Sequence, residues 1–288
     1  MQPPTSEETA TLLVSCPDRK GLVATLGQLL YGHGVNILDA DQHTDLSLGQ
    51  FFQRIRMDLR ELHTDRVGLE HAVAEVAERF SMRYQLCYGS HKRVAILVSK
   101  FDHCLQDLLW RRRAGELECD LTMVISNHSD LEPIVRAHDL PFHVCPIDRQ
   151  NKRTQEDHIL ELLDAQRIDL VVLARYMQVL SPEFCERYRE RLINIHHSFL
   201  PAFVGGKPYH QAAERGVKII GATAHYATSD LDQGPIIEQD VARVSHRDTI
   251  DDMVRKGRDL ERLVLARAVR LHLEDRVLVH GNKTVVFG

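Results

Sequence analysis

An Asn-x-His pair and a distant Asp are the residues whose types and spacing could carry out chemistry in this chain. Asn194 and His196 close the short β-branched run 191–195, and Asp232 follows the apolar run 217–226 in the phrase Leu-Asp-Gln-Gly-Pro. Each run is typical of a strand that ends in a loop. Side chains two residues apart in an extended chain project to the same side. We therefore expect Asn194 and His196 to converge on one reacting atom.

These three side chains suit attack on a carbonyl carbon. An amide offers a neutral N–H donor, an imidazole exchanges protons near neutral pH, and a carboxylate can fix the imidazole or accept a proton from water. Donors that face a developing oxyanion are often worth about 3 kcal/mol each. Taken singly, each residue is more often a turn former or a satisfied polar group. Their combination favours the chemical role.

Composition limits the classes of function. With 288 residues, 43% of them hydrophobic, the chain can bury a large core or two ordinary ones. A net charge of −5 gives no support to nucleic-acid binding. The apolar runs are too short to cross a bilayer and the first residues lack a secretion signal, so we expect a cytoplasmic protein that does not bind membranes. Six scattered cysteines without a C-x-x-C pair predict reduced thiols and no structural metal.

The first part of the chain, 1–88, predicts a βαββαβ order. Strand patterns cover 10–15, 36–43, 51–57 and 83–88, an amphipathic helix begins at Leu22, and a second helix covers 64–80. A polar linker, 89–92, follows.

The remainder, 93–288, alternates between strand and helix patterns. Strands are predicted over 93–98, 121–126, 142–145, 169–174, 191–195, 217–226 and 236–242, and helices over 104–113, 131–138, 154–165 and 249–273. A terminal hairpin is predicted from 276 to 287. Repeated βα units indicate an α/β, Rossmann-like, mostly parallel sheet with helices on both faces.

The motifs around the possible site resemble a known family. Asn-x-His, the following Ser-x-Leu-Pro, a Gly-containing loop before a helix, His225 and Leu-Asp-x-Gly-Pro are together similar to the 10-formyltetrahydrofolate-dependent formyltransferases and hydrolases, from residue 93 to the C-terminus. The resemblance implies that Asn194, His196 and Asp232 are catalytic and that His225 supports the site. It also implies a pterin slot, with walls at Tyr176, Met177, Val179 and Leu180 and a closing side that includes Thr228 and Asp230. Ordinary core at a helix entry is the alternative for those walls.

Two departures favour the hydrolytic branch of that family. Members that formylate glycinamide ribonucleotide hold its phosphate with a Gly-rich loop, whereas 99–104 has no glycine and contains Phe101 and Asp102. His197 and Phe199 stand where transferases commonly have Pro and Leu. We therefore expect hydrolysis of 10-formyltetrahydrofolate to tetrahydrofolate and formate, without a metal or cofactor. This reaction would supply formate for purine synthesis.

In this scheme water replaces the amine as nucleophile. Asp232 would deprotonate or orient the water, while Asn194 and His196 would stabilise the oxyanion. His196 would also handle the proton that leaves with N10 of the folate.

The phrases Pro-Asp-Arg-x-Gly-Leu and Gly-Val-Asn-Ile resemble an ACT domain, a ferredoxin-like module. The resemblance implies a homo-oligomer and a small amino-acid effector, with methionine or glycine the first candidates. Contacts would come from Asp18, Gly21, Asn36 and Ile37. Alternatively, Asp18 and Gly21 only shape a loop, or the module only dimerises.

Three other functions remain open at this point. One is formyl transfer to an amine acceptor, and a second is an amino-acid-sensing folate-binding protein without catalysis. The third is a metal-dependent amidohydrolase that uses His196, His197 and His225. This last function is disfavoured because neighbouring strand residues point to opposite faces and no His-Glu-x-x-His helix is present.

Overall fold

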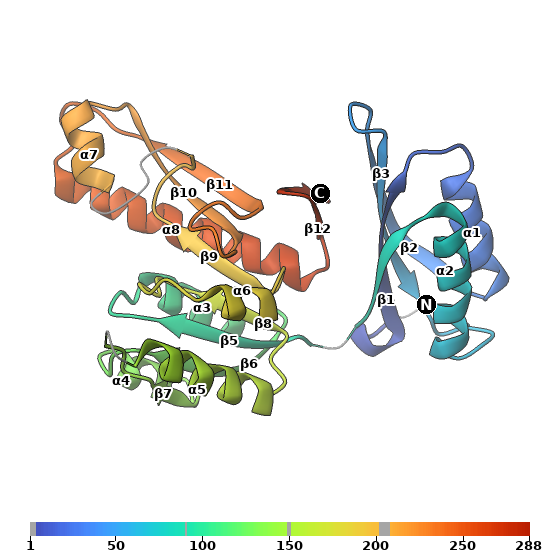
Figure 1. Cartoon of the computed structure of the whole chain (residues 1–288), viewed down its shortest axis with the longest axis horizontal. Helices are drawn as coiled ribbons and strands as arrows, with labels where there is room; N and C mark the ends of the chain where they lie inside the picture. Colours follow the sequence, from blue (N-terminus) through green and yellow to red (C-terminus); the bar gives the residue numbers. More distant parts are fainter. Residues whose placement is uncertain (1–3, 90, 149–150, 202–207) are drawn as a thin grey trace. The chain divides into compact units, whose positions relative to one another are not determined.

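The computed structural model describes residues 4–89, 91–148, 151–201 and 208–288 and divides into two compact units (Figure 1). The first unit takes in residues up to 91 together with 275–278 and 285–288, and the second takes in 92–274 and 279–284. The division after His91 falls in the predicted linker, 89–92, of which Ser90 lies outside the described residues. The Gly-containing loop before a helix contains Gly205 and Gly206, which lie outside them as well.

The first unit is the expected βαββαβ module. A short 3-10 helix, η1 (Ser6–Glu8), precedes β1 (Thr9–Pro17), α1 (Leu22–Gly32), β2 (Asn36–Asp45), β3 (Gln50–Asp58), α2 (Arg66–Phe80) and β4 (Arg83–Tyr88). The strands form an antiparallel sheet in the order β2-β3-β1-β4. Leu12 and Ile55 of the sheet form one core with Leu26 of α1 and Leu69 of α2. Burying each such side chain contributes about 1.5–3 kcal/mol.

The C-terminal residues correct the predicted division, which placed all of 93–288 in the second unit. Leu278 and Phe287 form a cluster with Leu13 of β1 and Phe52 of β3. They belong to the hairpin of β12 (Val277–His280) and β13 (Lys283–Val286) and to the residue that follows it. Because successive strand residues face opposite ways, Leu13 and Phe52 lie on the sheet face that α1 and α2 leave open. The C-terminal residues supply the apolar cover for that face.

In the second unit, the described residues form a seven-stranded sheet in the order β11-β10-β9-β8-β5-β6-β7. The strands β5 to β9 run parallel, and β10 and β11 are antiparallel additions at one edge. This arrangement confirms the mostly parallel α/β prediction. The elements are β5 (Arg93–Val98), α3 (His103–Arg113), β6 (Asp120–Ser126), α4 (Glu132–Arg136), β7 (Phe142–Val144), α5 (Lys152–Ala165), β8 (Leu170–Leu173), α6 (Pro182–Arg187), β9 (Leu192–His196), α7 (Pro208–Arg215), β10 (Ile219–Tyr226), β11 (Ile236–Arg243) and α8 (Ile250–Leu273).

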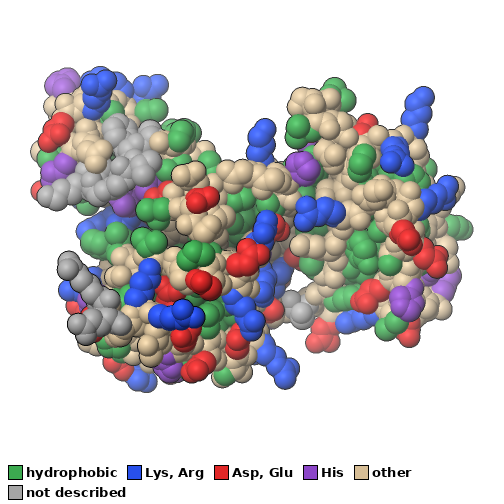
Figure 2. Space-filling model, in the orientation of Figure 1, with side chains coloured by type: hydrophobic (Ala, Val, Ile, Leu, Met, Phe, Trp, Pro, Cys, Tyr) green, Lys and Arg blue, Asp and Glu red, His purple; other side chains and the backbone are tan. Residues whose placement is uncertain are grey.

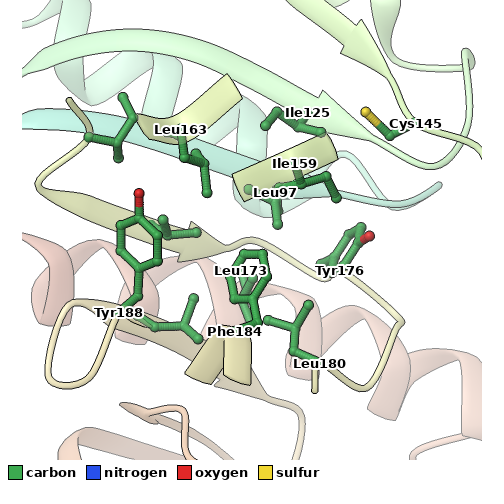
Figure 3. Close-up of a cluster of buried hydrophobic side chains, with 14 of the residues drawn as sticks. Leu97, Ile125, Cys145, Ile159, Leu163, Leu173, Tyr176, Leu180, Phe184 and Tyr188 are labelled. Atoms are coloured by element: carbon green, nitrogen blue, oxygen red, sulfur yellow. The ribbon is translucent and has the colours of Figure 1, made fainter. Parts of the chain in front are cut away.

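The core of this sheet supports the strand ends at which the predicted site lies. Leu97 and Leu173 of the central strands pack with Ile159 of α5 and Phe184 of α6 (Figure 3). Tyr176, just beyond β8, joins the same cluster. The backbone after β8 is therefore anchored by a buried aromatic ring.

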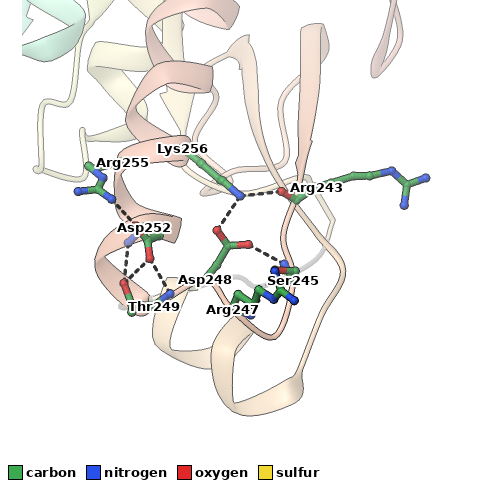
Figure 4. A network of polar contacts seen from close by, with 8 residues as sticks. All are labelled: Arg243, Ser245, Arg247, Asp248, Thr249, Asp252, Arg255 and Lys256. Carbon is green, nitrogen blue, oxygen red and sulfur yellow. Dashed lines mark hydrogen bonds and ion pairs between the residues drawn. The ribbon is translucent and has the colours of Figure 1, made fainter.

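Helix α8 begins at a well-defined cap. The Thr249 hydroxyl accepts a hydrogen bond from the Asp252 backbone N–H, and the Asp252 carboxylate accepts one from the Thr249 N–H (Figure 4). The Asp248 carboxylate accepts from Lys256 Nζ at 2.7 Å and from the Ser245 N–H at 2.7 Å. Such caps typically contribute about 1 kcal/mol. They fix the start of a 24-residue helix that contacts β9, β10 and β11.

A membrane-spanning segment would need a long apolar helix, and none occurs among the described residues.

Candidate active site

The register of three strands brings Asn194, His196 and His225 to one place. Asn194 and His196 lie at the carboxyl end of β9, beside the end of parallel β8. In the antiparallel pair of β9 and β10, His225 lies directly opposite Asn194, and Thr223 lies opposite His196. Asn194 Nδ2 and His225 Nε2 are 3.2 Å apart. Directly opposed residues of neighbouring strands share a sheet face, so this contact follows from the register.

The loop between β10 and β11 adds Asp232. Asp232 has a left-handed φ of 57°. Gly234 lies so close to the Tyr226 carbonyl that any Cβ would collide with it, and the Tyr226 N–H donates to the Pro235 oxygen at 2.9 Å. The turn therefore folds back onto β10. Asp232 Oδ2 lies 3.1 Å from His196 Nδ1, so the predicted trio comes together in the structure.

The hydrogen bonds indicate which ring nitrogens carry protons. His225 Nδ1–H donates to the Tyr226 carbonyl at 3.0 Å, and with the proton on Nδ1 the Nε2 atom accepts from Asn194. His196 Nδ1–H donates to Asp232. His196 Nε2 is buried and has no hydrogen-bond partner among the described residues. One ring nitrogen of His196 is therefore held by a carboxylate and the other is available to a bound molecule.

Asp232 stays ionised next to these rings. Burial alone would raise the pKa of Asp232, but the hydrogen bond from His196 opposes burial, and the pKa of Asp232 lies well below its ordinary value. The His225 contact is longer, at 3.7 Å from Nε2 to Oδ1. A carboxylate with so low a pKa is a weak base, and it is well suited to orienting His196 and stabilising its protonated form.

A cavity of about 300 Å³ opens beside the trio and borders all three side chains. Six of the seven residues predicted to bind substrate line it. They are Tyr176, Met177, Val179, Leu180, His225 and Thr228. The seventh, Asp230, is exposed and absent from the lining, its backbone oxygen accepts a hydrogen bond from Thr228 Oγ1, and its role in substrate binding stays a prediction.

The four predicted wall residues divide into two kinds. Tyr176 and Leu180 are buried members of the core, whereas Met177 and Val179 are about half exposed, at 51% and 55%. The Tyr176 hydroxyl accepts a hydrogen bond from Gln155 at 3.0 Å, and burial raises the pKa of Tyr176 to about 12. Ser99 Oγ accepts from the Met177 N–H and donates to Asn127, which ties together the loops after β5, β6 and β8. The walls therefore rest on a fixed backbone.

His197 corrects the expectation that neighbouring histidines point to opposite faces. Strand β9 ends at His196 and the chain bends at His197, so the two rings stack with centroids 5.1 Å apart. Alternation applies only while the chain stays extended. Arg175 Nη1 lies 2.6 Å from His197 Nδ1, so that nitrogen is not free to bind a metal.

Glu261 and Arg175 are the polar residues that the sequence patterns missed. Glu261 is 1% exposed on α8, where it contacts His103 and Tyr209, and Arg175 follows β8 with a left-handed φ of 65°. One sequence feature pointed to burial of Glu261: its position next to Leu260 on the apolar face of a helix. Nothing in the sequence indicated which cation it would meet.

Among the described residues, only His103, Cys104 and Glu261 group their donor atoms closely enough to hold a metal, within 4.8 Å of one another. The group does not suit a cation. Arg175 Nε already lies 3.4 Å from the Glu261 carboxylate, and burial raises the pKa of Cys104 well above its ordinary value, which disfavours the thiolate.

The four residues expected to bind an amino acid lie at two opposite ends of the first sheet. Asn36 is level with Thr9, because both pair with Asp58, and Ile37 follows it on β2. Asp18 and Gly21 come after the far end of β1, where Pro17 pairs with Gln50. Eight residues of strand separate these ends, about 27 Å. One copy of the chain therefore does not bring the four residues together.

Comparison with known proteins agrees with this geometry. The model of the formyl transferase family matches residues 92–269, and that of the ACT domain matches 10–79. A formyltetrahydrofolate deformylase from Synechocystis sp. is 56% identical, over 97% of this chain and 98% of that protein. The chain belongs to the formyltetrahydrofolate deformylase family.

Other members of the family are similar over the whole chain. The Bacillus subtilis formyltetrahydrofolate deformylase is 49% identical, over 98% of this chain and 95% of that protein. The crystal structure of a formyltetrahydrofolate deformylase from Pseudomonas syringae pv. tomato superposes with a TM-score of 0.94 at 51% identity, and it covers 97% of this chain and 94% of that chain. Both units of this chain are therefore common to the family.

Proposed function

We propose that Asn194, His196 and Asp232 carry out the reaction of this family in the present chain, the hydrolysis of 10-formyltetrahydrofolate to tetrahydrofolate and formate. The observation that carries the proposal is the buried, unpaired Nε2 of His196, which borders the cavity and is backed by Asp232 at 3.1 Å. Transfer of the formyl group to an amine is not favoured, because relatives matched over the whole chain are named as deformylases.

His196 Nε2 takes a proton from water as the water oxygen attacks the formyl carbon. The tetrahedral intermediate carries its negative charge on the former formyl oxygen. Collapse breaks the bond from carbon to N10, the proton on Nε2 passes to N10, and formic acid leaves and ionises to formate. Asp232 holds Nδ1–H throughout and stabilises the imidazolium.

This assignment gives the role of the base to His196, whereas the sequence analysis gives it to Asp232. Asp232 was expected to deprotonate or orient the water. Its contact with His196 and its low pKa favour His196 as the base and Asp232 as the group that orients it.

Asn194 is the donor for the oxyanion. One hydrogen of its amide nitrogen goes to His225 Nε2, and this contact orients the group. The second hydrogen is free to donate to the charged oxygen, a contribution of about 3 kcal/mol to the transition state.

The cavity is the site for the folate. Its walls are mainly apolar, which suits a flat bicyclic ring. One side runs from Tyr176 to Leu180, and the other is formed by Thr228, Ser229, Leu231 and Asp232. The scheme uses only protons and hydrogen bonds from the chain's own residues, so we expect a reaction that needs neither metal nor cofactor.

The first unit would bind an amino-acid effector, with methionine or glycine the first candidates. Since Asp18 and Gly21 lie far from Asn36 and Ile37 in one copy, a site that uses all four must combine two copies. This requirement supports a homo-oligomer. Formate release would supply purine synthesis and balance the one-carbon folate pools in the cytoplasm.

The test is a product assay with chelator-treated protein in water enriched in oxygen-18. We expect formate and tetrahydrofolate in equal amounts, with one labelled oxygen in each formate, because the nucleophile is water. No formate, or turnover that requires an added amine acceptor or metal, would reject the proposal.

A further inference from the structure

A second buried polar cluster lies beside the trio. The Glu261 carboxylate is within hydrogen-bond distance of His103 Nε2 at 2.7 Å and of the Tyr209 hydroxyl at 2.9 Å. Arg175 Nε lies 3.4 Å from the same carboxylate. Gly257, one helical turn before Glu261, lets Tyr209 approach, because a Cβ there would collide with the Tyr209 hydroxyl. Glu261 is thus contacted from three elements, and its carboxylate forms an ion pair with Arg175, whose Nε makes no hydrogen bond among the described residues.

Arg175 determines the protonation of the His197 ring. A guanidinium has only donors, so at 2.6 Å from Arg175 Nη1 the His197 Nδ1 atom must accept. The neutral ring then carries its proton on Nε2. The His196 ring differs, because its Nδ1 carries the proton and donates to Asp232.

The His197 ring lies against the His196 ring, with an angle of 23° between their planes. Tyr209 approaches the His197 ring as well, with centroids 6.3 Å apart. Both histidines border the cavity. A displacement of His197 would therefore change the space available to His196.

We propose that Arg175, held by Glu261, fixes the His197 ring with its proton on Nε2 and thereby positions the catalytic ring of His196. Arg175, Glu261 and His197 are positioning residues in this proposal, which rests on the role proposed above for His196. These three residues determine the position of the His196 ring, and Asp232 determines which nitrogen of that ring carries no proton.

Backbone and charge agree with this role. Arg175 adopts a left-handed φ of 65°, which is costly for a residue with a side chain and is tolerated where that side chain makes specific contacts. Its side chain is 11% exposed and also lies against the Phe101 ring. The titratable groups around His197 are Arg175, His196, Glu261, Asp232 and Tyr209. Burial, followed by Arg175 and His196, lowers the pKa of His197 to about 4, so the ring stays neutral at physiological pH.

The kinetic test compares Arg175→Met with Arg258→Met. Arg258 is an exposed arginine of α8 near the same Phe101 ring, so it controls for loss of a cation at that ring. We expect Arg175→Met to lower kcat by about tenfold to a hundredfold, because a misplacement of about 1 Å has an effect of that size. Arg258→Met should match wild type in both kcat and KM. Glu261→Gln should also lower kcat, as Arg175→Met does.

Nuclear magnetic resonance of the nitrogen-15-labelled histidines tests the same point without an activity assay. With the His197 signals assigned by comparison with His197→Asn, we expect a bare Nδ1 and a protonated Nε2 in wild type between about pH 6 and 8. In Arg175→Met the ring should titrate at a higher pH than in wild type.

Two results would overturn the proposal. One is a proton on Nδ1 of His197 in the wild-type protein, and the other is a folded Arg175→Met protein with wild-type kcat. If the wild-type protein releases no formate, the proposed function fails, while the resonance experiment still decides whether Arg175 fixes His197.

Discussion

His196 and His225 are both buried, on the neighbouring antiparallel strands β9 and β10, yet their surroundings suit different roles. Both nitrogens of His225 have partners, the Tyr226 carbonyl and Asn194. His196 has Asp232 on one side and a bare Nε2 on the other. Unpaired buried nitrogens are rare in folded proteins and call for an explanation. A base that awaits a substrate provides one, and His225 is left to orient Asn194.

Substitution of Asp232 tests this arrangement. Asp232→Asn removes the charge and lets an amide N–H face His196 Nδ1, so the ring would place its proton on Nε2 and lose the free lone pair. We predict that kcat for formate release falls by about a thousandfold or more, as when the carboxylate of a comparable triad is replaced.

Asp230→Asn is the matched control, since Asp230 lies in the same loop, is exposed and does not line the cavity. It should retain wild-type kcat. Equal activity of the two variants would show that Asp232 does not orient the base.

At the scale of elements, the site depends on where strands stop. Strand β9 ends at His196, β10 ends at Tyr226, and the turn between Tyr226 and Pro235 returns Asp232 to the end of β9. The apolar runs and the Gly-Pro pair indicated these ends in the sequence, which is why the trio could be predicted. The bend at His197 could not be predicted, because the alternation of side-chain directions along a strand was assumed to continue one residue beyond the end of β9.

The interior of the long helix was predicted less well. Hydrophobic periodicity groups Leu263 with Leu260 and Val264 on the buried side of α8, yet Leu263 is 38% exposed, whereas Glu261 is almost fully buried. Hydrophobic periodicity does not reveal a buried carboxylate whose partners, His103, Arg175 and Tyr209, come from other elements. Helix α6 was also missed, although Ser181 before Pro182 is a typical helix start, because the segment has only six residues.

The turn that carries Asp232 should not tolerate a side chain at Gly234. In Gly234→Ala the new methyl group would collide with the Tyr226 carbonyl, so the turn must open and withdraw Asp232 from His196. We expect a lower melting temperature and a fall in kcat of at least about tenfold.

Gly27→Ala is the comparison variant, because a Cβ at Gly27 would have open space within α1. Alanine there should leave stability unchanged or raise it by up to about 1 kcal/mol. An active, stable Gly234→Ala protein would mean that the turn is not needed to place Asp232.

At the scale of the molecule, the second unit contains a histidine that should make stability depend on pH. Burial, then Lys92 and Arg191, lowers the pKa of His272 to about 3, and its Nδ1 lies 2.8 Å from the Tyr226 hydroxyl. An unfolded histidine takes up a proton near pH 6.5. Between about pH 6.5 and pH 3 the unfolded chain therefore binds more protons, and stability falls as the pH falls.

From this histidine alone we predict a loss of about 1 kcal/mol in the free energy of unfolding between pH 7.5 and 5.5. Urea unfolding at both values measures it. His272→Gln should be less stable at pH 7.5 but should lose less on acidification, whereas His158→Gln, an exposed substitution on α5, should behave as wild type. An unchanged pH dependence in His272→Gln would refute this account.

The first unit makes a prediction about pairs of chains. If Asp18 of one copy and Asn36 of another form one amino-acid site, Asp18→Ala and Asn36→Ala should each abolish binding of methionine or glycine. A mixture of the two variants should regain binding in the mixed dimers, because one of the two sites then has both wild-type residues. Calorimetry on the separate and mixed proteins measures this, and binding by either variant alone would argue against a shared site.

The most direct test of the central claim is the rate of formate release by folded, chelator-treated His196→Ala protein, measured against wild type with saturating 10-formyltetrahydrofolate. If His196 Nε2 both accepts the proton of water and returns it to N10, kcat should fall by about a thousandfold or more. A folded His196→Ala protein whose kcat lies within about fivefold of wild type would contradict the account.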